Sequence, residues 1–238
     1  IIVSGFTVYR AAFNDIERTD FTVYTEAARH ALVGIDIYTA ENSRGWRYVY
    51  PPTFAIIMIP FYLMPLWAAS LTWCAISFIC LWLIYKNCIS FLHVKPIQAQ
   101  AAIFVFSTPI IGGIMRGQVS ILVSLLVITS VFLFSNKKSI LSGALLACAT
   151  MLKVYPVAML GYFIIYKDWK SVYGFALTIV ALGLLIPVSA LGIQGTIDSY
   201  QSWINIIAHP IAQSNDYRMQ HSDLYSQLLD SAKPRNQS

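Results

Sequence analysis

The sequence predicts an all-α fold, a polytopic transmembrane helical bundle. Of the 238 residues, 57% are hydrophobic and only 11% are charged, and the mean hydropathy is +0.62. An ordinary soluble domain of this size is far more polar. Several apolar runs, such as residues 97–115 and 172–193, reach the ~20 residues that a helix needs to cross the hydrocarbon core. We therefore expect an integral membrane protein.

The chain is expected to form one integral membrane domain over residues 1–238, and to be a fragment. Its first residue is Ile, and residues 1–9 read as the tail of an apolar run. Residues 10–50 are predicted to form an extracytoplasmic loop that contains short helices. Residues 53–193 would form the transmembrane block, and residues 194–238 a second extracytoplasmic region.

Lysine-rich loops set the predicted orientation. Two short loops, residues 135–138 and 166–170, carry two lysines each, and no acidic residue occurs between Tyr50 and Tyr166. Short loops rich in Lys and Arg are retained in the cytoplasm. Placing these two loops inside fixes the remaining segments by alternation.

The predicted elements then follow in chain order. They are a partial or surface-lying helix over 53–64, a full span over 66–85, spans over 97–114 and 119–134, a short hairpin over 139–165 with its tip at 153–156, and an outward span over 172–193. Prolines break the first of these helices. A polar break such as the hairpin tip is tolerated at membrane depth only inside protein or beside a wet cavity. This topology places Asp20, residues 50–52, residues 116–118 and Lys153 on the outer face.

Asp20 is the first candidate for chemistry. It opens a segment with helical spacing, and Tyr24 follows one turn later on the same face. An acid in the first helical turn is favoured by the helix dipole alone. The functional alternative is a general base at the water–lipid boundary. Asp36, in the following loop, is a second candidate carboxylate.

Arg116 and Lys153 are the cations closest to apolar segments on the predicted outer face. The positive-inside bias does not explain them there, and each would cost a few kcal/mol if it faced lipid at the midplane. Either side chain could extend to the interface. A phosphate partner would account for both, since Arg can bind phosphate with two parallel hydrogen bonds and Lys supplies a point charge.

The uncharged candidate residues can have structural roles in place of functional ones. The amide of Gln118 can donate and accept, as sugar hydroxyls require, or it can cap or pack a helix. The sequence Tyr50-Pro51-Pro52 removes two backbone donors and is structural by default. His209 and His221 are more typical of surface or packing residues.

Several classes of site are not supported. The four cysteines lack paired metal spacing and fit small buried residues, so no metal site is predicted. The net charge of +5 is explained by the lysine loops, and no nucleic-acid partner is expected. Glycine-rich nucleotide loops, HExxH and GxSxG motifs are missing, which leaves a soluble nucleotide-sugar or ATP site without support.

An ordered set of residues resembles the pattern of glycosyltransferase family 87. The set is Asp20, Tyr24, Ala28, Gly34, Tyr38, Tyr50-Pro51-Pro52, Phe54, Ala55, Pro60, Pro65, Trp73, Gly117-Gln118, Gly143, Lys153 and Pro156. That family includes polyprenyl-phosphate-mannose-dependent mannosyltransferases and related arabinofuranosyltransferases. The resemblance implies a GT-C type fold whose active site lies in an outward cavity at the inner or plasma membrane.

The resemblance also implies roles. The donor would be a polyprenyl-phosphate sugar that carries a mannose-like or arabinose-like unit, and the acceptor a cell-envelope glycan or glycolipid. Membrane lipid would be a further partner, and no cofactor is needed beyond the lipid-linked donor. Asp20 would be the base of an inverting displacement, and Lys153 with Arg116 would bind the donor phosphate. Sugar and acceptor contacts are assigned to Tyr24, Gln118, Tyr50 and His221.

The chain departs from the family pattern at one position. The family usually has Asn where this chain has Val119, so a role of that side chain is not carried over. Residues 220–224, which include His221, loosely resemble a later family segment, and this is why His221 is placed at the site.

Two other functions are compatible with the sequence. A secondary transporter also uses broken helices and intramembrane cations, although we find no inverted repeat between the two halves of the chain. A non-catalytic subunit of an envelope assembly complex is the third possibility.

Overall fold

The computed structural model describes residues 5, 7, 9, 19–92 and 94–208. Apart from one isolated bridge between Glu41 and Arg47, the regular elements of this part of the chain are helices. They are α2 (Asp20–Val33), η1 (Ile37–Thr39), α3 (Pro52–Ile57), α4 (Ile59–Tyr62), α5 (Leu66–Leu92), α6 (Pro96–Val105), α7 (Ser107–Met115), α8 (Ser120–Ser135), α9 (Ser139–Leu152), η2 (Tyr155–Met159), α10 (Leu160–Ile165), α11 (Trp169–Val180), η3 (Ala181–Leu185, a π-helix) and α12 (Ile186–Ala208). The predicted all-α class is confirmed.

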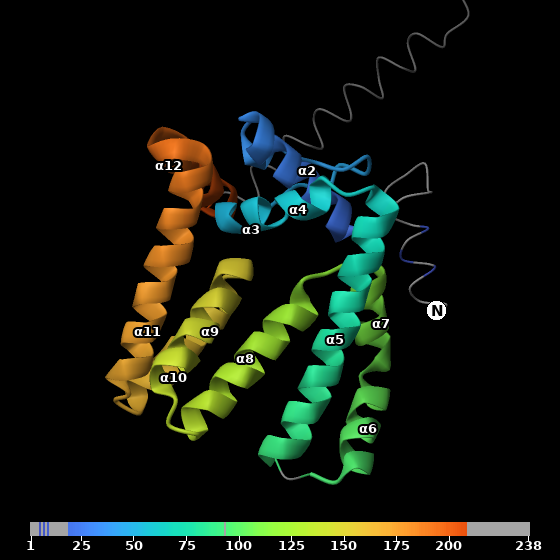
Figure 1. Ribbon diagram of the computed structural model, residues 1–238, viewed down its shortest axis with the longest axis vertical. Coiled ribbons are helices and arrows are strands. Elements are labelled where there is room, and N and C mark those ends of the chain that lie inside the picture. The colour runs from blue at the N-terminus through green and yellow to red at the C-terminus, as the bar shows by residue number, and fades with distance from the viewer. Residues whose placement is uncertain (1–4, 6, 8, 10–18, 93, 209–238) are drawn as a thin grey trace, which may run out of the picture.

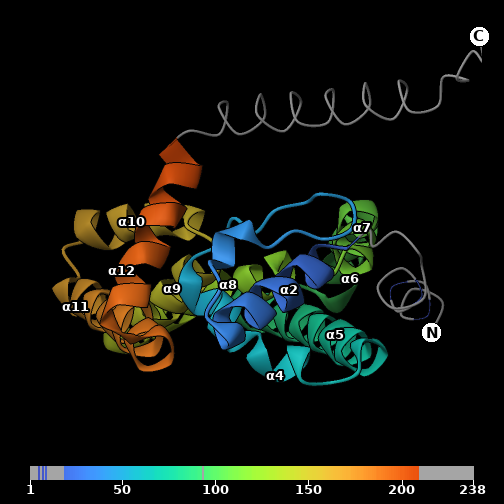
Figure 2. The ribbon, with the colours of Figure 1, turned by 90° about the horizontal axis from the view of Figure 1, so that it is seen from above.

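The helices form two layers (Figure 1). Helices α5 to α11 stand side by side as a bundle, and α2, η1, α3, α4 and the far part of α12 lie over one end of it. We call this second layer the cap. Figure 2, seen from the cap side, shows α2 and α12 lying across the bundle.

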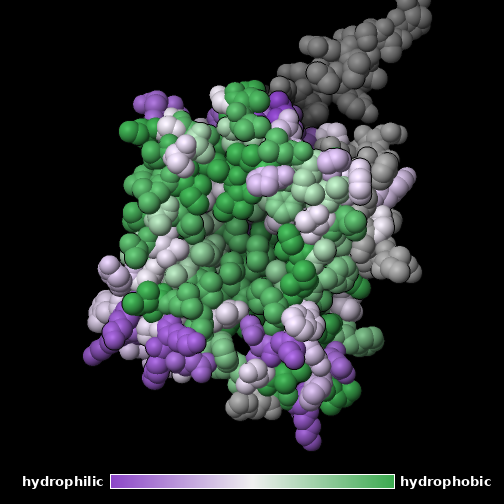
Figure 3. Space-filling model, in the orientation of Figure 1, coloured by the Kyte–Doolittle hydropathy of each residue, from purple (hydrophilic) through white to green (hydrophobic). Residues whose placement is uncertain are grey.

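The bundle has the surface of a membrane protein. On the face shown in Figure 3, a broad apolar band covers the bundle, and hydrophilic residues gather at the end away from the cap. The loops at that end include the lysine pairs of residues 137–138 and 167–170, and we call it the lysine-rich end. In the described residues, two helical segments are long and apolar enough to span a membrane, and a bent pair could make a third. The chain is an integral membrane protein.

The run over residues 97–114 is not the single straight span that the sequence suggested. It forms α6 and α7, which are bent by 63° relative to each other. Phe106 between them leaves helical geometry, with φ −92° and ψ 14°. Pro109 explains the break, because it lacks the N–H that would bond the carbonyl of Val105 and its ring crowds that carbonyl.

The hairpin predicted over residues 139–165 is present. Helix α9 rises to the cap, Lys153 follows it in an extended conformation, and η2 and α10 lead back to the lysine-rich end (Figure 1). Pro156 starts the return, at a position where its missing N–H costs little. The sequence therefore places Lys153 at the junction of bundle and cap.

Small residues let α9 approach its neighbours closely. A Cβ atom on Gly143 would lie 1.8 Å from the backbone oxygen of Ser171, and one on Gly174 would lie 2.2 Å from the backbone oxygen of Ile140. On the other side, the hydroxyls of Ser130 and Ser142 each donate to the other's carbonyl, at 2.8 and 2.7 Å. Small residues and serine hydrogen bonds are the usual means of packing helices in a bilayer.

Gly143→Ala is expected to lower the stability of the folded protein by about 1–3 kcal/mol, the usual cost of overpacking. The added methyl group would meet backbone atoms of α11 that cannot move aside, so the two helices must separate. The matched control is Gly161→Ala in α10, where nothing lies within 4 Å of the new Cβ. The midpoint of thermal unfolding in detergent should fall for the first variant only, and equal midpoints would contradict the close α9–α11 packing.

Helix α12 bends back over the bundle at Gly192. This residue has φ 72° and ψ 175°, a backbone conformation open to glycine. The far part of α12 then joins the cap, where the Trp203 indole donates to the carbonyl of Val49 at 3.2 Å. Tyr200 donates back to the carbonyl of Gly183 in the π-helix. These two hydrogen bonds join the far part of α12 to the residues that precede α3 and to the π-helix of the bundle.

Candidate functional site

Four segments that are distant in the sequence meet where the cap lies on the bundle. They are the start of α2, the residues that precede α3, the turn between α7 and α8, and the end of α9. Each of them carries residues that the sequence marked as candidates. Six of the seven site residues predicted from the sequence come together here: Asp20, Tyr24, Tyr50, Arg116, Gln118 and Lys153. We call these six residues the cluster.

Asp20 is the first residue of α2. The Thr19 side chain caps the helix by accepting from the N–H of Thr22, and the N–H of Asp20 donates to the carbonyl of Arg116 at 2.7 Å. Burial raises the pKa of the Asp20 carboxyl, while a hydrogen bond from the Gln118 side chain and the charges of Arg116 and Lys153 oppose the rise. The carboxylate is therefore half-buried beside two cations and an amide.

Gly117 allows the turn between α7 and α8 to pack closely against α2. Gly117 has φ +66°, and a Cβ atom there would lie 2.7 Å from the Cβ of Phe21. Its carbonyl accepts a hydrogen bond from the Trp73 indole at 2.9 Å. Because only glycine fits this conformation and this space, the turn holds Gln118 in a fixed position against Asp20.

Lys153 points from the end of α9 into the cluster. Its Nζ donates to the hydroxyl of Ser120 at 3.0 Å and lies 5.9 Å from the centre of the Tyr50 ring. Burial lowers the pKa of this amine, and the charge of Asp20 acts in the opposite direction. Sequence reasoning missed Ser120, because a serine that opens an apolar helix gives no signal beyond helix capping.

Tyr24 and Tyr50 form the aromatic wall of the cluster. Their hydroxyls are 3.0 Å apart, and their rings meet edge to face at 5.1 Å between centres. Burial raises the pKa of both hydroxyls, so both are neutral hydrogen-bonding groups at physiological pH. The carbonyl of Tyr50 accepts from the Tyr38 hydroxyl at 2.9 Å, which ties this wall to the rest of the cap.

Arg116 lies at the edge of the cluster, and the positions outside the cluster have different surroundings. The Arg116 side chain is exposed, and its backbone makes the contact with Asp20. Val119 is fully buried, and its backbone N–H is directed at the Tyr24 hydroxyl. Asp36 caps η1 by accepting from the N–H of Tyr38 at 3.0 Å. His209 and His221 lie outside the described residues.

The cluster combines complementary chemical groups. One carboxylate can accept a proton, two cations can balance a dianion, and an amide with two neutral phenols can orient hydroxyls. These groups lie where the cap meets the apolar bundle. A molecule with a charged head and an apolar tail fits such a boundary.

Comparison with known proteins gives one match. A profile described as glycosyltransferase family 87 matches residues 48–228. The matched region contains Tyr50, Arg116, Gln118 and Lys153, while Asp20 and Tyr24 precede it. No curated protein and no solved structure is significantly similar to the chain.

Proposed function

Because the chain belongs to glycosyltransferase family 87, we propose that this membrane glycosyltransferase takes its sugar from a polyprenyl-phosphate donor. The sugar would be a hexosyl or pentosyl unit, such as mannose or arabinose, and the acceptor a cell-envelope glycan or glycolipid. The cluster would be the active site, on the extracytoplasmic face of the inner or plasma membrane. No metal or other cofactor has a role in this proposal.

One observation supports the proposal most strongly. Asp20 and Lys153 are distant in the sequence, and each lies in the electrostatic field of the other within a half-buried cluster. A buried or half-buried charge is costly unless it is paired or has a function. An acid and a cation on either side of a sugar would serve the two ends of a displacement, namely the attacking hydroxyl and the departing phosphate.

The proposed reaction is a single displacement at the anomeric carbon. The acceptor oxygen forms a bond to this carbon from the side opposite the phosphate, and the bond between the carbon and the phosphate oxygen breaks. Asp20 takes the proton of the attacking hydroxyl as the new bond forms. The electron pair of the broken bond stays on the phosphate, where Lys153 and Arg116 stabilise the added charge. The configuration at the sugar is inverted.

The neutral residues would hold the sugars during this step. The Gln118 amide and the hydroxyls of Tyr24 and Tyr50 can each exchange hydrogen bonds with sugar hydroxyls. Their fixed positions matter, because alignment of the reacting atoms supplies a large share of enzymatic rate enhancement. His221 stays a prediction for acceptor binding.

The experiment that tests this function uses membranes that contain the protein and a panel of radiolabelled polyprenyl-phosphate sugars. Label should pass from at least one lipid donor to an envelope glycan or glycolipid, and membranes without the protein should show no such transfer. Uptake of free sugar into sealed vesicles without any lipid donor, and no transfer of label, would favour the secondary transporter instead.

The pH dependence of transfer should reflect the surroundings of Asp20. A base works only when ionised, so kcat/KM should fall as the pH drops through the pKa of this carboxyl. Because burial raises that pKa, the fall should occur at a higher pH than for an exposed aspartate. Gln118→Leu removes a hydrogen bond that lowers the pKa, and it should move the acid limb to still higher pH. An acid limb that is identical in the two proteins would argue against Asp20 as the titrating group.

A further inference from the structure

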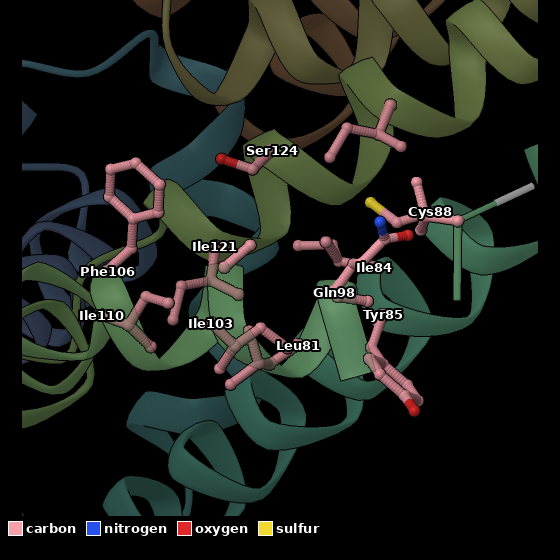
Figure 4. A pocket seen from close by; sticks show the side chains of 14 residues that line it. Leu81, Ile84, Tyr85, Cys88, Gln98, Ile103, Phe106, Ile110, Ile121 and Ser124 are labelled. Atoms are coloured by element: carbon pink, nitrogen blue, oxygen red, sulfur yellow. The ribbon is translucent and has the colours of Figure 1, made fainter. Parts of the chain in front are cut away.

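A pocket in the cap differs in its chemistry from the groove of the bundle. The groove between α5, α6, α7 and α8, of about 380 Å³, is lined mostly by apolar side chains and by no acidic or basic one (Figure 4). The pocket in the cap, of about 230 Å³, lies between α2, the loop after η1, α4 and the start of α5; we call it the cap pocket. Its lining combines two carboxylates and two hydroxyls with aromatic and aliphatic side chains: Thr22, Thr25, Glu26, Glu41, Phe61, Tyr62, Met64 and Leu66.

The cap pocket is separate from the cluster. Both use the first two turns of α2, but Asp20 and Tyr24 share one face of this helix. At about 100° per residue, Thr22 and Glu26 lie on the opposite face. The two sites are therefore one helix diameter apart, ~10–12 Å. No residue of the cluster lines the pocket, so a molecule bound there leaves the cluster free.

The aromatic core of the cap holds the apolar wall of the pocket in place. The Phe61 ring meets the Phe21 ring edge to face at 6.1 Å between centres, and the Trp73 ring at 5.5 Å. Tyr62 follows Phe61 in α4 and is half-buried. Aromatic rings offer flat apolar surfaces with a defined orientation. The C–H groups on one face of a sugar ring can pack against such a surface.

Hydrogen bonds hold the polar wall of the pocket in place. The buried Thr22 hydroxyl donates to the carbonyl of Thr19 at 2.8 Å and accepts from the Asn42 amide at 3.3 Å. The Thr25 hydroxyl donates to the carbonyl of Thr22 at 3.1 Å, and its oxygen can still accept a hydrogen bond. The pocket is thus formed before any ligand binds, with a polar side and an apolar side.

Both carboxylates of the pocket are paired with arginines. Arg29 donates two hydrogen bonds to Oε1 of Glu26, at 2.7 and 3.0 Å, and His30 approaches the same oxygen at 3.5 Å. Arg47 lies 3.8 Å from Glu41 across the loop. Oε2 of Glu26 has no partner in the described part of the chain and can accept from a ligand. Because the charges are already balanced, the pocket favours a neutral ligand with hydroxyl groups over a cation.

We propose that the cap pocket is a second, non-catalytic site that binds one neutral sugar ring. The bound ring packs a C–H face on Phe61 and Tyr62, and its hydroxyls donate to Glu26 and Glu41. The volume is below the ~300–1,000 Å³ of pockets for drug-sized ligands, which suits a single ring. Its role in transfer rests on the proposed function: the site holds one sugar of an acceptor glycan while another sugar reaches Asp20.

Saturation-transfer NMR tests the site without any lipid donor. The purified protein in detergent is mixed with a panel of free neutral hexoses and pentoses, and at least one should receive saturation from the wild type. Glu26→Gln should weaken its binding by about tenfold, since it removes a charge-assisted hydrogen bond. Tyr62→Leu should also weaken binding, because it removes the flat ring. Asp198→Asn is the matched control, as this exposed carboxylate in α12 lies outside the pocket.

The outcomes separate the cap pocket from the cluster and from the proposed function. Sugar binding that is equal in wild type, Glu26→Gln and Tyr62→Leu would overturn the site, and so would a complete lack of sugar binding. Binding lost in Gln118→Leu but kept in Glu26→Gln would place the sugar in the cluster and also overturn it. An unchanged midpoint of thermal unfolding shows that a variant is folded. Sugar binding at the cap pocket without any transfer from lipid donors would contradict only the proposed function.

Discussion

Asp20→Asn is expected to lower the turnover of sugar transfer by about 10²- to 10⁴-fold, the usual contribution of a general base. The amide has nearly the shape of the carboxylate but cannot take the proton of the acceptor hydroxyl. The fold should persist, because Thr19 still caps α2 and the loss of a first-turn charge costs only about 0.3–1 kcal/mol. Transfer is measured with the radiolabelled lipid donor at equal amounts of inserted protein.

Asp36→Asn is the matched control for this variant. Asp36 also belongs to the cap, but its carboxylate caps η1 and accepts from Ser202 at 3.2 Å. The asparagine oxygen can still accept from the N–H of Tyr38 and its amide NH2 can donate to the Ser202 hydroxyl, so transfer should stay near the wild-type level. Wild-type turnover in Asp20→Asn would exclude Asp20 as the base, and a loss confined to Asp36→Asn would move the base to that residue.

Lys153→Met is expected to lower kcat/KM by about 10²- to 10³-fold, the scale seen when one preorganised charge-stabilising group is removed. Methionine keeps much of the apolar stem but cannot balance the negative charge that develops on the departing phosphate. Lys153→Arg should restore only part of the loss, because the planar guanidinium cannot keep the single hydrogen bond to Ser120 in the same geometry.

The control for Lys153 is a lysine at the other end of the bundle. Lys138 precedes α9 at the lysine-rich end, and its side chain is exposed. Lys138→Met should leave kcat/KM unchanged. If the two variants lose activity equally, the loss reflects insertion or orientation in the membrane, and the phosphate-binding role of Lys153 is wrong.

Much of this architecture could be predicted from sequence because lipid restricts the options. Apolar run length, proline positions and the lysine loops were sufficient to expect α5, the α9 hairpin and the broken helix over residues 53–64. The same reasoning put Asp20, Gln118 and Lys153 at one end of the bundle, and the structure brings them together. Their roles in catalysis remain predictions.

The rest depends on packing that the sequence pattern does not encode. The bend at Phe106 could be predicted only from Pro109, a single residue within an otherwise continuous apolar run. The hydrogen bond between Lys153 and Ser120 depends on how α8 and α9 pack together, which the sequence does not show.

Binding of polyprenyl phosphate, the released product, is the most direct test of the claim that the cluster holds a lipid-linked phosphate. It needs no knowledge of the sugar. Purified wild-type protein should bind it saturably, and Lys153→Met should weaken binding by about tenfold or more, since a charge-assisted contact is worth roughly 1.5–3 kcal/mol. Asp20→Asn should bind at least as tightly as wild type, because it removes a negative charge near the phosphate. Equal binding by wild type and Lys153→Met, or equal weakening in both variants, would contradict the account.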